Sequence, residues 1–338
     1  MNHPAPRVSI LATGGTIAMT TTDDTSSGGV RPKLTAQQLA SAVPRLADLP
    51  VMLTYRDVRQ LPGASLSPAD LFEVADLAAR EIRAGAAGVV VTQGTDSIEE
   101  TAYFLDLVHD LPAPLVVTGA MRSPSLAGAD GPANLLAAVQ AAASPPARGL
   151  GCLVVMNGEV HEARWVCKSH TTAPSAFTSP EVGPIGHLVE GSLRLLRGSS
   201  RDLRSLVRGT GRDAEVRVAL VTIAFGDDGD LLRKFDAHVD GVVVAAFGAG
   251  HVPARMVPVL ADLAARLPVV LASRTGAGPV LSATYGFPGS ESDLLGRGLI
   301  SAGYLHPFKA RILLHLLLSA RADHARITDA FALAGAAS

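Results

Sequence analysis

Three glycine-containing segments in the first half of the chain place hydroxyl, carboxylate or cationic side chains beside the glycines. They are residues 13–18 (TGGTIA), 93–97 (QGTDS) and 119–122 (GAMR), and Lys168 follows further along. A threonine hydroxyl acts as a nucleophile when a nearby group takes its proton. A lysine that is partly removed from water, together with an aspartate and a threonine, can supply that group. The residue types therefore predict nucleophilic chemistry at a hydroxyl.

The first two segments also have simpler structural explanations. The glycines of residues 13–18 allow a close backbone approach to a ligand, but a strand-to-loop turn with an N-capping threonine explains them equally well. Ser97 and Glu100 have the spacing of a capping box that opens a helix at residue 98. Such a box leaves Thr95 and Asp96 at the start of the helix, where backbone N–H groups favour developing negative charge.

The third segment and the lysine have alternatives as well. Asp130 stands just before a proline, so its simplest role is to cap a helix, while Ala120 and Met121 would contribute backbone and shape. Lys168 is one of only four lysines in a chain with 29 basic residues, and it follows an apolar run. The alternative for Lys168 is an ordinary surface lysine.

Other kinds of site lack support in the sequence. No G-x-G-x-x-G follows the first strand, no G-x-x-x-x-G-K-[ST] occurs, and the nearest imitation, GAGHVP at 248–253, ends in proline. The H-E-x-x-H and G-x-S-x-G patterns are absent too, so we expect His161, His170 and His251 to be hydrogen-bonded structural residues. The two cysteines have no zinc-like spacing. We expect neither a metal nor an organic cofactor.

The composition is that of a globular protein with a small-molecule partner. Of the 338 residues 48% are hydrophobic and 18% charged, and the net charge of -2 gives no electrostatic reason to bind nucleic acid. The amino terminus lacks a basic segment followed by a long apolar one, and no stretch of about 18 apolar residues could span a bilayer. We therefore expect a cytoplasmic protein without membrane contact.

Apolar runs alternate with helical patterns along the chain. In the first half, strands are predicted at 8–13, 51–55, 88–92, 115–118 and 152–156, and helices at 68–84 and 98–109. In the second half, strands are predicted at 217–223, 241–247 and 268–273, and helices near 255–266 and 308–320. This pattern predicts the α/β class, with a doubly wound, mostly parallel sheet in a larger N-terminal domain and a smaller C-terminal α/β domain.

A change of composition separates these halves. The chain loses hydrophobic periodicity and gains glycine, serine and charge between Gly198 and Glu215. We predict an N-terminal domain over 1–200 that carries the catalytic threonines, a linker over 201–215, and a C-terminal domain over 216–338.

Taken together, the motifs resemble those of the bacterial asparaginase/glutaminase family. The resemblance spans nearly the whole chain. It depends on all the motifs together, because each motif alone is weak evidence. It is carried by LATGGTIA, GTDSIEETAYFL, TGAMR with ADGPANL, VVMN, and KAR at 309–311. It implies a two-domain α/β subunit that hydrolyses the side-chain amide of free L-asparagine, with L-glutamine as the alternative substrate. It also implies self-association as a dimer or tetramer that shares active sites.

The resemblance also implies roles for individual residues. Thr16 matches the family nucleophile, which forms an acyl-enzyme that water then hydrolyses. Thr95, Asp96 and Lys168 match a second catalytic group, in which Lys168 and Asp96 poise Thr95 and Asp96 also holds the α-ammonium of the substrate. Backbone N–H groups of Gly15 and Thr95 would stabilise the oxyanion.

Substrate contacts are implied in the third segment, and the chain departs from the family pattern elsewhere. The Ala120 carbonyl, next to Met121, would accept a hydrogen bond from the leaving amide. The tyrosine that the family usually carries in its mobile loop is replaced by Gly29. The serine that grips the α-carboxylate is replaced by Gly63, which leaves backbone donors and Ser65 as a substitute.

A further departure concerns the C-terminal domain. Positions through which family members reach a neighbouring subunit's site fall near His251 and at 283–285, so we expect an altered interface contribution.

Two rival functions remain open. One is the related amidotransferase subunit that releases ammonia from glutamine for transfer onto charged tRNA, which would need an extra amino-terminal domain. The other is a non-catalytic amino-acid sensor that kept the pocket and lost turnover.

Overall fold

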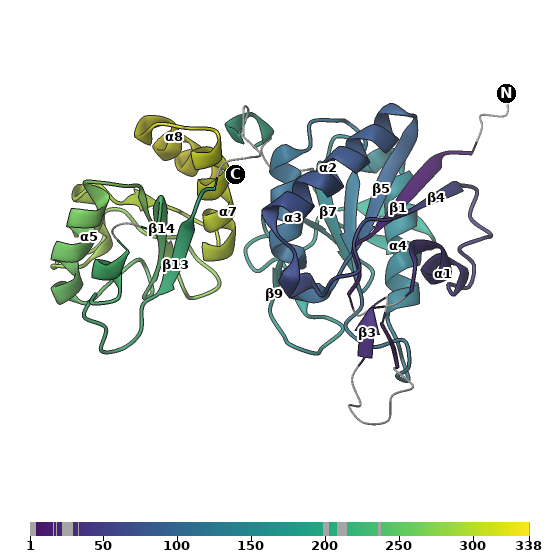
Figure 1. Cartoon of the computed structure of the whole chain (residues 1–338), viewed down its shortest axis with the longest axis horizontal. Coiled ribbons are helices and arrows are strands. Elements are labelled where there is room, and N and C mark those ends of the chain that lie inside the picture. Colours follow the sequence, from purple (N-terminus) through teal and green to yellow (C-terminus); the bar gives the residue numbers. More distant parts are fainter. Residues whose placement is uncertain are drawn as a thin grey trace. The chain divides into compact units, whose positions relative to one another are not determined.

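The protein is described by a computed structural model, shown in Figure 1, in which two units are distinguished. The structure describes residues 5–15, 17, 19–21, 30–32, 34–198, 203–207, 215–235 and 238–337. The first unit comprises Met1–Ser200 and the second Arg201–Ser338. Each unit has its own sheet and its own buried apolar core.

An eight-stranded sheet forms the centre of the first unit. Its strands run in the order β12-β11-β8-β7-β6-β5-β1-β4. Their bounds are β1 Arg7–Ala12, β4 Met52–Asp57, β5 Ala86–Thr92, β6 Leu115–Thr118, β7 Cys152–Met156, β8 Glu159–Glu162, β11 Gly186–Val189 and β12 Ser192–Leu195. The five strands from β7 to β4 are parallel to one another, and β8, β11 and β12 extend the sheet antiparallel.

Helices cover both faces of this sheet, which explains the continuous apolar runs of its parallel strands. On one face α1 (Ala36–Ser41) and α4 (Gly131–Ala143) pack on alternate residues such as Ile10 and Val90. On the other face α2 (Pro68–Arg83) and α3 (Ile98–Val108) pack on the intervening residues such as Leu11 and Val91. Since strand side chains alternate between faces, both sets are buried.

Local sequence fixes where α1 and α2 begin. Thr35 and Ser67 are N-caps, and each forms a reciprocal capping box with the residue three positions later. Pro68 occupies the first turn of α2, where its missing N–H leaves no hydrogen bond unmade.

Two strand pairs and three 3-10 turns complete the described part of the first unit. They are the antiparallel pair β2 (Met19–Thr21) and β3 (Val30–Pro32), the antiparallel pair β9 (Cys167–Lys168) and β10 (Phe177–Thr178), and the 3-10 turns η2 (Gly63–Ser65), η3 (Thr95–Ser97) and η4 (Pro145–Ala147).

The second unit has a four-stranded parallel sheet in the order β13-β14-β15-β16. Its strands are β13 Val218–Thr222, β14 Gly241–Ala246, β15 Val269–Ser273 and β16 Ile300–Ser301. Its helices are α5 Val257–Ala264, α6 Glu291–Gly296, α7 Pro307–Ser319 and α8 His324–Ala334, with 3-10 turns η5 Arg204–Val207, η6 Leu232–Lys234 and η7 Ala254–Met256.

The predicted fold class is confirmed, and every predicted strand and helix has a counterpart within a few residues. The sequence did not predict β8, β11 and β12, because these four-residue strands have no apolar run: β8 is mostly buried but carries polar side chains, and β11 and β12 are partly exposed. It also did not predict α6, α8 and β16. Among the described residues, no helix is both long enough and apolar enough to cross a membrane.

The order of the parallel strands fixes where a ligand can bind in the first unit. The chain passes from β1 to β4 on one side of β1, and then continues through β5, β6 and β7 on the other side. Connections therefore diverge at β1 and β5, and ligands in open α/β sheets bind outside the carboxyl ends of strands at such a point. The segments that begin at residues 13 and 93 follow these two strands.

Candidate active site

A threonine, an aspartate and a lysine from distant parts of the chain meet at the carboxyl end of β5. Lys168 Nζ donates hydrogen bonds to Thr95 Oγ1 at 2.9 Å and to Asp96 Oδ1 at 3.1 Å. The exposed fraction is 6% for Thr95 and 14% for the Lys168 side chain, whereas the Asp96 side chain is 65% exposed. The Lys168 ammonium and the Thr95 hydroxyl are therefore hydrogen-bonded and mostly shielded from water, while the Asp96 carboxylate faces solvent, where it can bind a cationic ligand.

Two short elements hold this group in place. Thr95 and Asp96 begin η3, which follows β5 through Gly94 and leads directly into α3. Lys168 lies in β9 and pairs with Phe177 of β10, and the residues before it form a turn rather than the apolar strand suggested by the sequence. Because the Lys168 side chain is mostly buried and hydrogen-bonded, the alternative of an ordinary surface lysine does not hold.

Glycine allows the loops after β1 and β5 to touch through their backbones. Gly15 has φ +87°, and a Cβ atom there would lie 2.0 Å from the Gly94 nitrogen. Gly14 has φ +109°, and a Cβ atom there would lie 2.6 Å from the Leu61 carbonyl oxygen. Side chains at these positions would collide with backbone atoms, so the contact requires glycine.

The loop that carries η2 joins the same arrangement. A Cβ atom on Gly63 would lie 2.7 Å from the Gly94 carbonyl oxygen. The Ser97 hydroxyl donates to the Gly63 carbonyl at 2.8 Å and accepts from Gln93 Nε2 at 3.0 Å. The predicted capping box is therefore wrong at Ser97, because this hydroxyl connects two loops and makes no cap hydrogen bond in α3.

The loop after β6 is held by two side chains from the start of α4. Asp130 accepts from the backbone N–H groups of Met121 at 3.0 Å and Arg122 at 2.8 Å. Asn134 Nδ2 donates to the Gly119 carbonyl at 3.0 Å and to Asp130 Oδ2 at 3.1 Å. Asp130 is the N-cap residue of α4 by position, but its side chain makes no cap hydrogen bond, so the predicted capping role is wrong.

The loop after β6 also contacts Gln93 and Thr95, the residue that binds Lys168. A Cβ atom on Gly119 would lie 2.6 Å from the Gln93 carbonyl oxygen and 3.3 Å from Thr95 Cγ2. The loops that follow β1, β5 and β6, together with the η2 loop, thus form one backbone-lined surface around Thr95.

Both units match known protein families. Residues 7–201 match the family "Asparaginase, N-terminal", and residues 217–331 match the "Glutaminase/Asparaginase C-terminal domain". The chain belongs to the asparaginase family. The family resemblance inferred from the motifs is thereby confirmed.

Several relatives are similar over nearly their whole length. The "Probable L-asparaginase" of Deinococcus radiodurans is 37% identical, with 96% of this chain and 97% of that protein covered. The "Glutaminase-asparaginase" of Pseudomonas aeruginosa is 33% identical, with 96% and 89% covered. The crystal structure of a "Probable Cytoplasmic L-asparaginase" from Campylobacter jejuni superposes with a TM-score of 0.85 at 32% identity, covering 97% of this chain and 99% of that one.

The asparaginase-family residues predicted from sequence fall into three groups. Gly15, Thr95, Asp96 and Lys168 lie together in the geometry given above. Four others lie in the surrounding loops. Ala120 is buried, and the Met121 N–H donates to Asp130. Gly63 contacts Gly94, and Ser65 is exposed in η2. Thr16 and Gly29 lie outside the described residues.

Sequence reasoning missed the side chains that hold the loops. Gln93, Ser97, Asp130 and Asn134 each bond to a loop that carries a candidate site residue. A polar side chain in or just after a glycine-containing loop was the available signal. Its partner could not be known, because Ser97 and Gly63 are 34 positions apart.

The histidines behave as predicted. His161 Nδ1 lies 3.0 Å from Ser179 Oγ, His170 Nδ1 accepts from two backbone N–H groups, and His251 Nε2 lies 3.1 Å from Glu291 Oε2. Within the described ranges, no group of three or more metal-ligating side chains is positioned to hold an ion.

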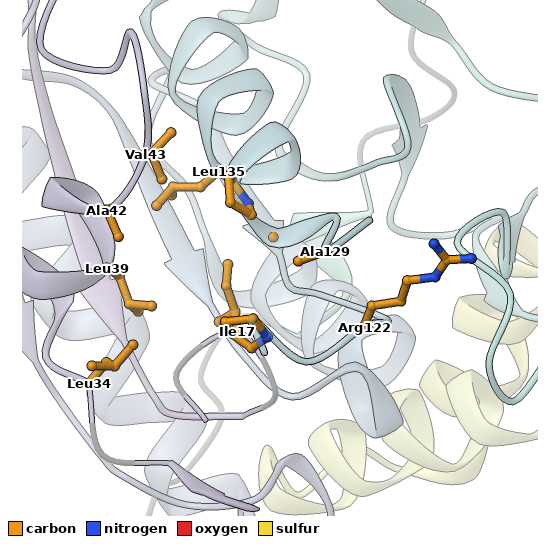
Figure 2. Close-up of a pocket in the computed structure, with 11 residues that line it drawn as sticks. Ile17, Leu34, Leu39, Ala42, Val43, Arg122, Ala129 and Leu135 are labelled. Atoms are coloured by element: carbon orange, nitrogen blue, oxygen red, sulfur yellow. The ribbon is translucent and has the colours of Figure 1, made fainter. Parts of the chain in front are cut away.

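A small apolar cavity of about 60 Å³ lies next to the loop that follows β1. It is lined by Ile17, by Leu39 and Val43 in and after α1, and by Leu135 of α4, whereas the guanidinium of Arg122 points away from it (Figure 2). The cavity borders the residue directly after Thr16 but contains none of the proton-carrying groups. The hydrogen-bonded Thr95, Asp96 and Lys168 therefore do not line this cavity.

Proposed function

We propose that the protein hydrolyses the side-chain amide of free L-asparagine to L-aspartate and ammonia. The observation that carries the proposal is the hydrogen-bonded Thr95–Asp96–Lys168 group at the point where the strand connections diverge. It occurs in a chain of the asparaginase family whose relatives bear the name L-asparaginase.

The proposed reaction proceeds in two steps. Thr16 Oγ1 attacks the amide carbon, the C–N bond breaks, and ammonia leaves with the hydroxyl proton, so that an ester to Thr16 remains. Water then attacks this ester, its oxygen becomes part of the aspartate carboxylate, one of its protons returns to Thr16, and the other is released as the new carboxylic acid ionises. Lys168, Thr95 and Asp96 form the group through which these protons move.

Backbone groups stabilise the charge that develops on the amide oxygen. The N–H groups of Gly15 and Thr95 are proposed to form the oxyanion site, and the contact of Gly15 with Gly94 supports this by bringing the two loops together. The Ala120 carbonyl is proposed to accept an N–H of the leaving amide. Each of these groups is held by the fold before substrate binds.

The substrate's charged groups are proposed to bind at the exposed edge of the site. Asp96 would bind the α-ammonium, since its side chain is mostly exposed and its Oδ1 already bonds to a cation. The η2 loop would bind the α-carboxylate. A side chain at position 63 would collide with Gly94. The proposed donors in the η2 loop are therefore the Ala64 N–H and the Ser65 side chain.

Neither a metal nor an organic cofactor is part of the proposal, because a hydroxyl and a preorganised oxyanion site suffice for amide hydrolysis. We further propose a cytoplasmic protein that self-associates as a dimer or tetramer, without nucleic-acid or membrane partners. The structurally similar Campylobacter jejuni protein is named as cytoplasmic, which supports the location.

L-Glutamine is the second candidate substrate, since the Pseudomonas aeruginosa relative is named Glutaminase-asparaginase. An assay of ammonia release with L-asparagine, L-glutamine and D-asparagine decides between the substrates. We expect the highest kcat/KM with L-asparagine. Tight binding of an amino acid without ammonia release would instead identify the protein as a sensor.

A further inference from the structure

We propose that Asp130 is a positioning residue for departure of the leaving group, because its carboxylate fixes the peptide that contains the Ala120 carbonyl. The inference rests on the proposed amide hydrolysis. In this role Asp130 assists cleavage of the C–N bond, so it affects amide substrates in particular.

The geometry follows from the planarity of the peptide bond. The Ala120 carbonyl and the Met121 N–H belong to the same peptide, and the described residues include no cis peptide bond. In a trans peptide the carbonyl and the N–H point in opposite directions. Since the Met121 N–H donates to Asp130 Oδ2 at 3.0 Å, the Ala120 carbonyl must point away from Asp130.

Two further bonds prevent this peptide from rotating. The Arg122 N–H donates to the other oxygen of the same carboxylate at 2.8 Å. On the opposite side, the Gly119 carbonyl accepts from Asn134 Nδ2, and the Asn134 side-chain oxygen accepts from the Asn157 N–H at 2.9 Å. The peptides on both sides of the Ala120–Met121 peptide are therefore held by side chains of α4.

The carboxylate also changes the strength of the carbonyl as an acceptor. A peptide whose N–H donates to a charged group is polarised, so its carbonyl oxygen carries more negative charge. Ala120 is only 1% exposed, and electrostatic interactions are stronger where water is excluded. Asp130 thus aims the Ala120 carbonyl and strengthens it.

The chemical consequence depends on the leaving group. As the C–N bond of an amide breaks, the nitrogen gains a proton, and its N–H groups become better donors to the Ala120 carbonyl. An ester of the same acid releases methanol, whose oxygen takes up the proton that leaves Thr16 and carries no further hydrogen that could donate to the Ala120 carbonyl. Weakening the carbonyl should therefore slow cleavage of an amide and leave cleavage of the ester nearly unchanged.

The test compares Asp130→Asn with the wild type on L-asparagine and on L-aspartate β-methyl ester. An asparagine at 130 loses the charge and can accept only one of the two N–H bonds. We expect kcat/KM for the amide to fall on the order of 10- to 100-fold, and that for the ester to fall less than about threefold. Asn134→Ala should shift the amide-to-ester ratio in the same direction.

Asp106→Asn is the matched control. Asp106 also accepts a backbone N–H, that of Cys152 at 2.8 Å, but it does so at the amino end of β7, away from the site. This variant should keep the wild-type ratio. The ratio is measured on one sample, so partial misfolding of a variant cancels.

The possible outcomes distinguish failure of the role of Asp130 from failure of the proposed amide hydrolysis. An equal loss of amide and ester cleavage in Asp130→Asn, including loss of both, overturns the inference. Wild-type activity of this variant on both substrates overturns it as well. If wild-type protein releases no ammonia from L-asparagine or L-glutamine, the proposed function itself fails.

Discussion

The contact between Gly15 and Gly94 leads to a prediction for Gly15→Ala. At φ +87° any Cβ atom is strained, at a cost of about 1–2 kcal/mol. In addition the new Cβ would lie 2.0 Å from the Gly94 nitrogen and 2.3 Å from Gly94 Cα, distances that no real Cβ contact shows. Relief of such overpacking costs about 1–3 kcal/mol more. The total loss of unfolding free energy is therefore about 2–5 kcal/mol.

Gly85→Ala separates the two contributions. Gly85 has a similar φ of +96°, but nothing lies within 4 Å of its Cβ position. This variant should lose only the strain term of about 1–2 kcal/mol. The measurement is the urea midpoint of the first unit's unfolding transition for the wild type and both variants.

Activity should separate the variants further. To relieve the overlap at Gly15, the loops after β1 and β5 must move apart by about 1 Å, a displacement that can lower kcat on the order of 100-fold. Gly85→Ala should keep its activity, since it lies at the end of α2 away from the loops. If Gly15→Ala were as stable and as active as Gly85→Ala, the proposed contact between the loops would be refuted.

Three other variants test separate parts of the account. Lys168→Met should lower kcat for ammonia release on the order of 100- to 1000-fold, because it removes the proposed proton-transfer group; a near-normal kcat would contradict that role. Ser97→Ala should raise KM about 5- to 30-fold with a smaller change in kcat, because the Gly63 carbonyl loses its hydroxyl donor. Burial and the nearby Lys309 lower the pKa of His306 from 6.5 to about 4, so the unfolded chain binds more protons between these values. Unfolding free energy should therefore fall by up to about 3 kcal/mol from pH 6.5 to 4, and His306→Gln should flatten this slope in urea titrations; an equal slope would contradict the shift.

The parallel part of the fold was predictable because burial on both faces leaves a simple signature. Strands such as GVVVT at 88–92 need apolar residues at every position, whatever the rest of the chain does. The glycine-containing loops were recognisable for a related reason. Only glycine permits the backbone contacts and positive φ angles at Gly14 and Gly15.

The partners of polar side chains were not predictable. Ser97 and Asp130 both stand at helix starts, where local sequence favours capping, yet each side chain bonds to a loop brought near by the sheet order. A capping residue and a loop-holding residue look alike in sequence, because both use a short oxygen-bearing side chain. The difference depends on tertiary contacts.

The C-terminal positions that we predict to depart from the family pattern illustrate the same limit. His251 packs edge-on against Tyr285, with ring centroids 4.8 Å apart, and bonds to the buried Glu291. Burial raises the pKa of Glu291, but hydrogen bonds from three backbone N–H groups and from the His251 side chain outweigh it and lower this pKa. Residues 40 positions apart thus form one surface cluster that neither segment reveals by itself.

The central claim is that a threonine hydroxyl of this site hydrolyses the amide of L-asparagine. The most direct test is ammonia release from L-asparagine by wild-type protein, Thr16→Ala and Thr95→Ala, each checked for its fold by circular dichroism. We predict turnover by the wild type and a loss on the order of 1000-fold or more in Thr16→Ala, with a large loss in Thr95→Ala as well. Wild-type rates in a folded Thr16→Ala variant would contradict the account.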